Sequence, residues 1–276
     1  MYSRRCALVV GVLLFTCSFL RGGVFAEETH AAIRIAAVYR VDLAVFNLGS
    51  FRLTTTLKGS DYRLRGEARF SVLGGLVFEG RGTAESSGKV IDSGPEPEKY
   101  TLRYVAGDKR GKLRMSFNGG AVVQVSMVPK KKRNPHNVPT TKEQLAGVLD
   151  PMTGGFLSVH SDKPNGDVKV CDRTIPVFDG ERRFDIVLTP KRTVRVEKEI
   201  PTGYSGDIAV CRVKFIPISG HRPDNRGNKL MSQTDEIEVW IVSLPGTIMY
   251  LPYRIVLPTP IGYGSATMTS FQIEKD

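Results

Sequence analysis

The sequence predicts a mainly β protein, in which one strongly curved antiparallel sheet, a β-spiral or open barrel of roughly 12 to 14 strands, wraps around one kinked α-helix. Three observations lead to this fold class. Most of the chain alternates apolar and polar residues with a period of two, which is typical of half-buried strands. Turn residues separate the alternating runs, as in consecutive hairpins. Only residues 140–158 repeat like a helix, and a sheet of this size coils around an interior that a helix can fill.

The first 26 residues have the features of an export signal. Two arginines precede an apolar run over residues 7–20, and Val24-Phe25-Ala26 has the small-residue pattern of a signal peptidase site. The run is short for a membrane span, and no second apolar stretch of that length follows in the sequence. We therefore expect cleavage after residue 26, and a single domain over residues 27–276 with no transmembrane segment.

The chain is basic. Its formal net charge of +11 at pH 7 falls to +8 once Arg4, Arg5 and Arg21 leave with the signal. In an exported protein, surplus positive charge fits anionic headgroups, lipopolysaccharide phosphates or cell-wall polymers better than nucleic acid. The same charge is also consistent with solubility alone, so these readings stay open.

Residues 27–128 are predicted to form an N-terminal meander. Apolar side chains occupy the odd positions of residues 31–46, a turn is expected at Asn47-Leu48-Gly49, and alternation resumes over residues 51–57 and 62–72. Residues 89–99 are interpreted as a polar loop. Later alternating runs, with a hairpin signal at Asn118-Gly119, complete an antiparallel arrangement.

Residues 129–139 are predicted to be a basic loop. It contains four consecutive cations, Lys130, Lys131, Lys132 and Arg133. Such a run is usually a solvated loop, and an anion-binding patch is the alternative.

The helix is predicted over residues 140–158. Its apolar residues recur at i, i+3, i+4, i+7 and i+11 and so share one face: Leu145, Val148, Leu149, Met152 and Phe156. Thr140 and Glu143 have the spacing of a capping box. Asp150-Pro151 is read either as a kink or as the N-cap and first residue of a second short helix. The apolar face either fills the core or forms a gate or wall of a ligand site.

Residues 159–276 are predicted to form the C-terminal strands. Residues 237–242 carry apolar side chains at both odd and even positions, which predicts a central strand with two buried faces. Pro252, Pro258 and Pro260 favour positions near an edge or a bend. Residues 221–227 read as the longest loop of this half.

The cysteines predict one disulfide. Cys6 and Cys17 leave with the signal, so Cys171 and Cys211 remain in a compartment where thiols oxidise. Closing a loop of about 41 residues would destabilise the unfolded chain by roughly 3 to 4 kcal/mol. A zinc site joining these cysteines to two histidines, His160 and His221, is the rival reading, but the gaps match none of the tight spacings of structural zinc.

No catalytic, cofactor or metal site is predicted, so we expect a protein that is not an enzyme. Residues 203–206 and 262–265 contain a serine beside glycine but lack the spacing of an esterase elbow. His221 and Asp224 flank Pro223 and are read as an Asx-type turn. The carboxylates are scattered and suggest no paired acid and base.

Several segments together carry a family resemblance: Asp150-Pro151-Met152, residues 171–185, Cys211-Arg212-Val213, residues 217–223, residues 237–240, Pro252-Tyr253-Arg254 and Pro258-Thr259-Pro260. They resemble the exported Gram-negative bacterial family labelled domain of unknown function 3108. Similarity to β-spiral envelope-integrity proteins and lipoprotein-carrier folds is more distant. The resemblance implies a β-rich periplasmic protein with no established catalytic residues. Gly154-Gly155 departs from the bulkier residues expected after Asp150-Pro151-Met152-Thr153.

We therefore expect a periplasmic envelope protein that binds an apolar or amphipathic partner, such as a lipid, an acyl chain or an envelope protein segment. The predicted ligand-binding residues are Leu145, Val148, Leu149, Met152, Phe156 and Trp240. An envelope hydrolase acting on cell-wall polymer is the first alternative, and a convergent His, Asp and Ser cluster in one pocket would favour it. A structural interaction protein that uses exposed sheet edges is the second.

Overall fold

The computed structural model describes residues 31–72, 78–132, 134–156, 158–159, 165–197, 204–244 and 249–275, and the described residues belong to one compact unit that begins at Ala31. The predicted signal, residues 1–26, lies outside the described residues, and its cleavage stays a prediction.

Fourteen strands form one sheet. Seven precede the helical region: β1 (Ile33–Leu43), β2 (Phe46–Lys58), β3 (Asp61–Val72), β4 (Phe78–Ile91), β5 (Gly94–Ala106), β6 (Lys109–Asn118) and β7 (Ala121–Val128). Seven follow or interrupt it: β8 (Ser158–Val159), β9 (Arg173–Phe178), β10 (Arg183–Val196), β11 (Gly206–Ser219), β12 (Glu238–Ser243), β13 (Met249–Thr259) and β14 (Gly262–Lys275). Among the described residues, the helical elements are two 3-10 turns, η2 (Glu143–Leu145) and η3 (Val168–Cys171), and two short helices, α1 (Pro151–Phe156) and α2 (Arg226–Gln233).

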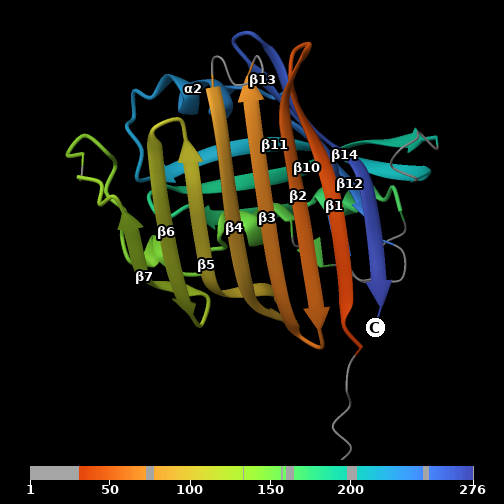
Figure 1. The fold of residues 1–276 in the computed structure, drawn as a ribbon, viewed down its shortest axis with the longest axis horizontal. Coiled ribbons are helices and arrows are strands. Elements are labelled where there is room, and N and C mark those ends of the chain that lie inside the picture. The colour runs from red at the N-terminus through yellow and green to blue at the C-terminus, as the bar shows by residue number, and fades with distance from the viewer. Residues whose placement is uncertain are drawn as a thin grey trace, which may run out of the picture. The chain divides into compact units, whose positions relative to one another are not determined.

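The sheet is an antiparallel path with β1 near its middle. The strand order is β7-β6-β5-β4-β3-β2-β1-β14-β13-β12-β11-β10-β9, and β8 pairs with the start of β13. Strands β7 and β9 end the path without pairing with each other, so the sheet stays open. Figure 1 shows β10 and β11 passing behind the N-terminal strands and running across their direction. This arrangement confirms the predicted class, a mainly β, strongly curved antiparallel sheet.

The segment between η2 and α1 bridges the two ends of the sheet. Gly147 N donates to Gly120 O beside β7 (2.8 Å), and Leu149 N donates to Pro176 O of β9 (2.8 Å). Phe178 N in turn donates to Leu149 O (2.9 Å), which gives a short parallel bridge. Residues 146–149, named here the bridging segment, therefore span the opening of the sheet with backbone hydrogen bonds.

This bridge corrects the predicted helix over residues 140–158. The backbone N–H groups of Gly147 and Leu149 are used by the sheet ends, so they are not available for helical bonds, and Gly147 has a φ of +65°. A helix begins only at Pro151, where Asp150 Oδ1 accepts hydrogen bonds from Met152 N (2.9 Å) and Thr153 N (3.1 Å). The alternative reading of Asp150-Pro151, as the N-cap and first residue of a short helix, is the one that the structure has.

The reciprocal capping pair also lies one residue later than predicted. Thr141 N donates to Gln144 Oε1 (3.2 Å) and Gln144 N donates to Thr141 Oγ1 (3.4 Å). The hydroxyl of Thr140 is instead hydrogen-bonded to Ser219 Oγ (2.9 Å). The threonine that was expected to cap a helix therefore holds the chain against β11.

Two buried clusters divide the core. The first faces β1–β6 and includes Tyr39, Leu64, Met115 and Met268. The second lies against β10–β13 and η3, and includes Leu188, Cys211, Ile241 and Tyr250. Neighbouring residues of the C-terminal strands belong to different clusters, in the pairs Ile208 and Ala209, Ile241 and Val242, and Tyr250 and Leu251. Strands β11–β13 therefore bury both faces, which confirms the prediction for residues 237–242.

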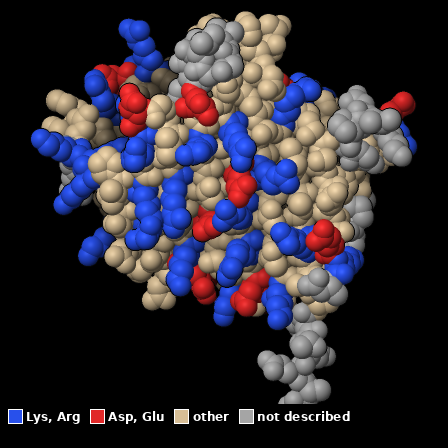
Figure 2. Space-filling model, viewed as in Figure 1, with Lys and Arg blue, Asp and Glu red and all other residues tan. Residues whose placement is uncertain are grey.

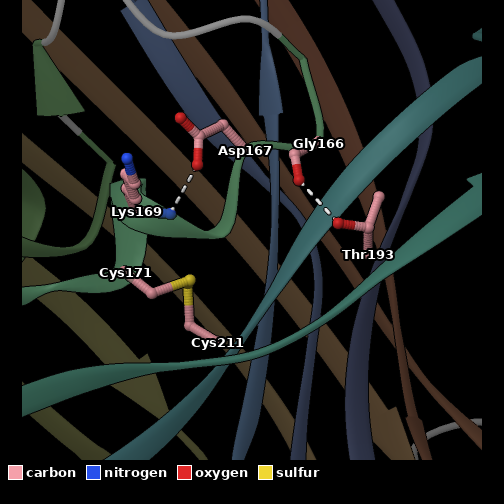
Figure 3. The surroundings of a disulfide bond; sticks show 6 residues. All are labelled: Gly166, Asp167, Lys169, Cys171, Thr193 and Cys211. Carbon is pink, nitrogen blue, oxygen red and sulfur yellow. Dashed lines mark hydrogen bonds between the residues drawn. A yellow bond between two sulfur atoms is a disulfide. The ribbon is translucent and has the colours of Figure 1, made fainter.

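The disulfide between Cys171 and Cys211 is confirmed, with a Cα–Cα distance of 5.3 Å. Figure 3 shows that it joins η3 to β11, while Asp167 accepts a hydrogen bond from Lys169 N (2.8 Å) and Gly166 O accepts one from Thr193 Oγ1 (2.7 Å). These contacts hold residues 166–171 over the second cluster. Because the two sulfurs are bonded to each other, neither cysteine is a thiolate ligand for zinc, and His160 lies outside the described residues.

Candidate functional site

A cavity beside the C-terminal strands has a volume of about 1010 Å³. One wall is a continuous apolar surface contributed by five strands, β9–β13: Ile175, Leu188, Val213, Val239, Ile241 and Ile255. Register explains why these side chains converge, because Leu188 pairs with Val213 and Val239 pairs with Ile255. Paired residues share a face of the sheet, so the alternation of five strands supplies one aliphatic wall.

The lining also includes short elements from elsewhere in the chain. The turn between β4 and β5 contributes Ile91, Pro95 and Pro97, and α2 contributes Met231. The sequence predicted a polar loop over residues 89–99, but the two strands continue almost to the turn and pair Ile91 with Gly94. Ile91 and the two prolines among these polar residues were the sequence signal that could have indicated a lining role for this turn. Helix α2 was also missed, although Asn225 is a good N-cap and accepts from Asn228 N (2.9 Å).

Two adjacent glycines of α1 also line the cavity, and they differ in what surrounds them. A Cβ on Gly154 would lie 3.0 Å from Val177 Cγ2 and 3.3 Å from Ile175 Cγ2. A Cβ on Gly155 would have no atom within 4 Å. Gly154 therefore permits close packing of α1 on β9, whereas Gly155 adjoins open space.

Arg173 is the cation among the lining residues. It stands on β9 opposite Leu188, and the side chain is half-buried with its Nε atom shielded from solvent. Burial lowers the pKa of Arg173 to about 10, so the guanidinium remains charged at neutral pH. The acidic lining residues, Asp92 and Glu96, lie at the β4–β5 turn. An apolar wall thus has one positive charge set into it.

The structure brings only part of the predicted ligand set to this cavity. Val148 and Leu149 of the bridging segment line it. Leu145, Met152 and Phe156 instead pack with the first cluster, where the Phe156 ring stacks on Phe51 at 5.1 Å between centroids.

Trp240 lies on the other face of β12 from Val239 and Ile241. Its ring stands between two cations, with Arg192 Cζ at 5.7 Å and Arg254 Cζ at 5.6 Å from the centroid. The indole Nε1 donates to Glu238 Oε2 (2.9 Å). Trp240 therefore packs against the first cluster, has charged groups around its ring, and is not a lining residue of the cavity.

Asp150 is the one fully buried acid among the described residues. Its carboxylate accepts hydrogen bonds from Ser86 Oγ (2.7 Å), Thr153 Oγ1 (2.7 Å) and two backbone N–H groups. Burial raises the pKa of this carboxyl group. No histidine is among these partners, and Asp150 is not a lining residue. Because Ser86 belongs to β4 and Thr153 to α1, the network joins α1 to β4.

The predicted anion patch has one cation already paired. Lys131 Nζ lies 2.6 Å from Glu181 Oε2, while Lys130 and Lys132 are exposed. Arg133 lies outside the described residues. In the part of the chain that the structure describes, three or more potential metal ligands nowhere come together, and no helix has the length and apolar character of a membrane span.

Comparison with known proteins gives a family and a distant structural likeness. The model of a family described as "Protein of unknown function (DUF3108)" matches residues 38–269, which confirms the resemblance seen in the sequence. The crystal structure of a β-barrel-like protein of domain of unknown function DUF1849 from Brucella abortus is similar over 89% of this chain and 99% of that chain, with 9% identity and a TM-score of 0.49. No curated protein matches.

Proposed function

The chain belongs to the DUF3108 family, whose description assigns no activity, and we propose that it is a non-enzymatic periplasmic envelope protein that binds an apolar or amphipathic ligand. The observation that carries this proposal is the cavity of about 1010 Å³ with an aliphatic wall from β9–β13. Ligand sites are typically concave, mostly apolar and roughly 300 to 1,000 Å³ in volume, with a few polar groups that fix orientation.

The chemistry of the wall favours an acyl chain. Aliphatic side chains offer dispersion contacts but few hydrogen bonds, and burying a methylene group contributes about 0.8 kcal/mol. A ligand with many methylene groups therefore gains most from this wall, whereas a sugar or peptide backbone would leave polar groups unsatisfied. This argues for binding and against hydrolysis of cell-wall polymer.

Arg173 favours an amphipathic ligand over a wholly apolar one. A guanidinium beside an aliphatic wall can donate charge-assisted hydrogen bonds to a carboxylate or phosphate. The acyl chain would then lie along β10–β13 with its acidic headgroup toward β9.

The compartment and the envelope role are supported by two features. The N-terminal pattern predicts export, and the disulfide between Cys171 and Cys211 is typical of an oxidising compartment. A ligand carrier or lipid-bound scaffold in that compartment would serve envelope integrity.

The test compares two phenylalanine substitutions on neighbouring strands. Val239 lines the cavity, whereas Val256 of β13 is opposite Glu238 on the other face and does not. Val239→Phe is expected to weaken binding of a dansyl-labelled fatty acid by about tenfold or more, because the ring occupies ligand volume. Val256→Phe is the control and is expected to bind like the wild type. Equal affinities for all three proteins would contradict the proposal.

A further inference from the structure

The outward face of β3–β6 carries a dense group of positive charges. Figure 2 shows Lys and Arg side chains over much of this face, with fewer Asp and Glu side chains among them. Six cations occupy positions that alternate with the buried residues of these strands: Arg69, Arg81, Arg103, Arg110, Lys112 and Arg114. These six residues are named here the basic face.

Strand register places like charges directly opposite one another. Arg69 of β3 pairs with Arg81 of β4, and Arg103 of β5 pairs with Lys112 of β6. Like charges at such positions destabilise an antiparallel pair. Partial desolvation and the nearby charges of Arg114 and Arg103 lower the pKa of Lys112. An anionic partner would relieve this repulsion.

Acidic residues on the same side do not neutralise the basic face. Arg65 forms ion pairs with both neighbouring carboxylates, those of Glu67 (2.8 Å) and Glu85. Among the described residues, none of the six cations takes part in an ion pair. The positive charges of the basic face are therefore not neutralised by ion pairs within the described residues, and an anionic partner could bind them.

The surface is also hollowed where the charges meet. A shallow groove of about 310 Å³ is lined by Arg69, Arg81 and Arg103, together with Thr83, Tyr104 and the already paired Glu67. The other three cations lie on β6, which continues the face beyond the groove.

We propose that the basic face docks the protein on an anionic lipid surface. Strands lie about 4.8 Å apart and alternate residues about 6.8 Å apart, so cations on four strands are too widely spread for one small anion. An array of lipid phosphates can contact them together, because the six side chains lie on the same side of four adjacent strands. This surface is separate from the cavity, and its use does not depend on a ligand there.

The test uses the full mature chain and vesicles of phosphatidylcholine with or without phosphatidylglycerol. Arg81→Gln combined with Arg103→Gln removes two cations from the groove. Arg195→Gln combined with Arg222→Gln removes the same net charge from residues that are paired with Asp207 and Asp224, away from the basic face. Co-sedimentation measures the partition of each protein.

The wild type should bind only the vesicles that contain phosphatidylglycerol. Each cation near such a surface contributes about fivefold, so the groove variant should bind about 25-fold more weakly, and the control variant should bind within about twofold of wild type. Removal of like-charge repulsion should leave the melting temperature of the groove variant unchanged or raised, which separates lost binding from unfolding.

Three results would overturn the proposal. The first is equal partition of the wild type on both vesicle types. The second is an equal loss in the groove and control variants, which would reveal only a net-charge effect. The third is displacement of the protein by inorganic phosphate at low millimolar concentration with the ionic strength held constant, which would identify a discrete phosphate site.

Discussion

The N-terminal and C-terminal strands of this one sheet differ in how many faces they bury. In β3, Tyr62 and Leu64 are buried while the intervening Arg63 and Arg65 are exposed. In β11, four consecutive residues, Ile208, Ala209, Val210 and Cys211, are all buried. The N-terminal strands can therefore present a charged outer face to a partner, whereas the C-terminal strands need cover on both sides.

The cavity follows from how that second face is covered. The first face of β11–β13 packs on the cluster shared with β1–β6, whereas the described residues beside the second face belong to short elements: η3, α1, α2, the bridging segment and the β4–β5 turn. Short elements do not match the area of five strands, so an aliphatic surface beside them stays unfilled. A cavity can thus arise where a doubly buried sheet lacks a second full layer.

Removing the disulfide should have one of the two largest effects on stability and should act on the C-terminal half. Cys171→Ser combined with Cys211→Ser is expected to lower the free energy of unfolding by about 3 to 4 kcal/mol, because the unfolded chain regains loop entropy. Urea denaturation measures this loss. Unfolding of the wild type with and without a reductant is the control, and an unchanged midpoint in both experiments would contradict the expectation.

Two leucine truncations compare the packing of the two halves. Leu64 is fully buried in the first cluster, whereas Leu188 lines the cavity. Leu64→Ala should lower the free energy of unfolding by about 3 to 4 kcal/mol, because it removes buried surface and leaves a new cavity. Leu188→Ala should lower it by about 2 kcal/mol, because part of the space around Leu188 is already empty. Equal losses would indicate that the cavity wall is packed as tightly as the core.

Acid should weaken an ion pair cluster on the face of β12 that points away from the cavity. Glu238 is held by Arg192 Nη1 (2.8 Å) and Lys191 Nζ (2.6 Å), and these contacts lower its pKa from 4.5 to about 2. A carboxyl group with a lowered pKa stabilises the fold at pH values above its pKa in the unfolded chain. This contribution is lost as the pH falls from about 4.5 to 2. Glu238→Gln should therefore cost about 2 kcal/mol at pH 7.

The pH dependence of that variant provides its control. Because the carboxylate contribution disappears in acid, wild type and Glu238→Gln should converge in stability toward pH 2. Denaturant titrations at several pH values measure the difference. A constant difference across the range would show that Glu238 acts through packing and not through its charge.

The two glycines of α1 should give the smallest effects, with opposite signs. Gly154→Ala would place a Cβ in close contact with Val177 and should lower the free energy of unfolding by about 1 kcal/mol. Gly155→Ala meets no atom within 4 Å and should gain up to about 1 kcal/mol, because alanine favours a helix. Thermal melts compare them, and the same sign for both would contradict the described contact between α1 and β9.

The N-terminal half was the part that sequence predicted best, because one buried face makes every second residue apolar. Its errors come from local geometry. The first turn was expected at Asn47-Leu48-Gly49, but β1 ends at Leu43 and Ala44 takes a positive φ of 50°. Gly49 lies inside β2, where Arg69 O approaches so closely that no Cβ would fit. The exposed Val45 and Phe46 gave no turn signal.

Local sequence patterns do not predict the bridging segment or the cavity. Val148 and Leu149 have helical spacing to Leu145, yet residues far away in sequence, Gly120 and Pro176, take up the backbone groups of this segment. When both faces of a strand are apolar, alternation does not tell which face adjoins empty space. Two of the six predicted ligand residues, Val148 and Leu149, therefore line the cavity, while Arg173 and the β4–β5 turn were missed.

Mass spectrometry of the protein purified from its native host tests the central claim most directly. Under native conditions the wild type should carry an acyl-chain ligand with an acidic headgroup, since the cavity has an aliphatic wall and one guanidinium, that of Arg173. Val239→Phe should lose this ligand, and Val256→Phe should retain it. A wild-type protein without any bound amphiphile, or equal loading of all three proteins, would contradict the account.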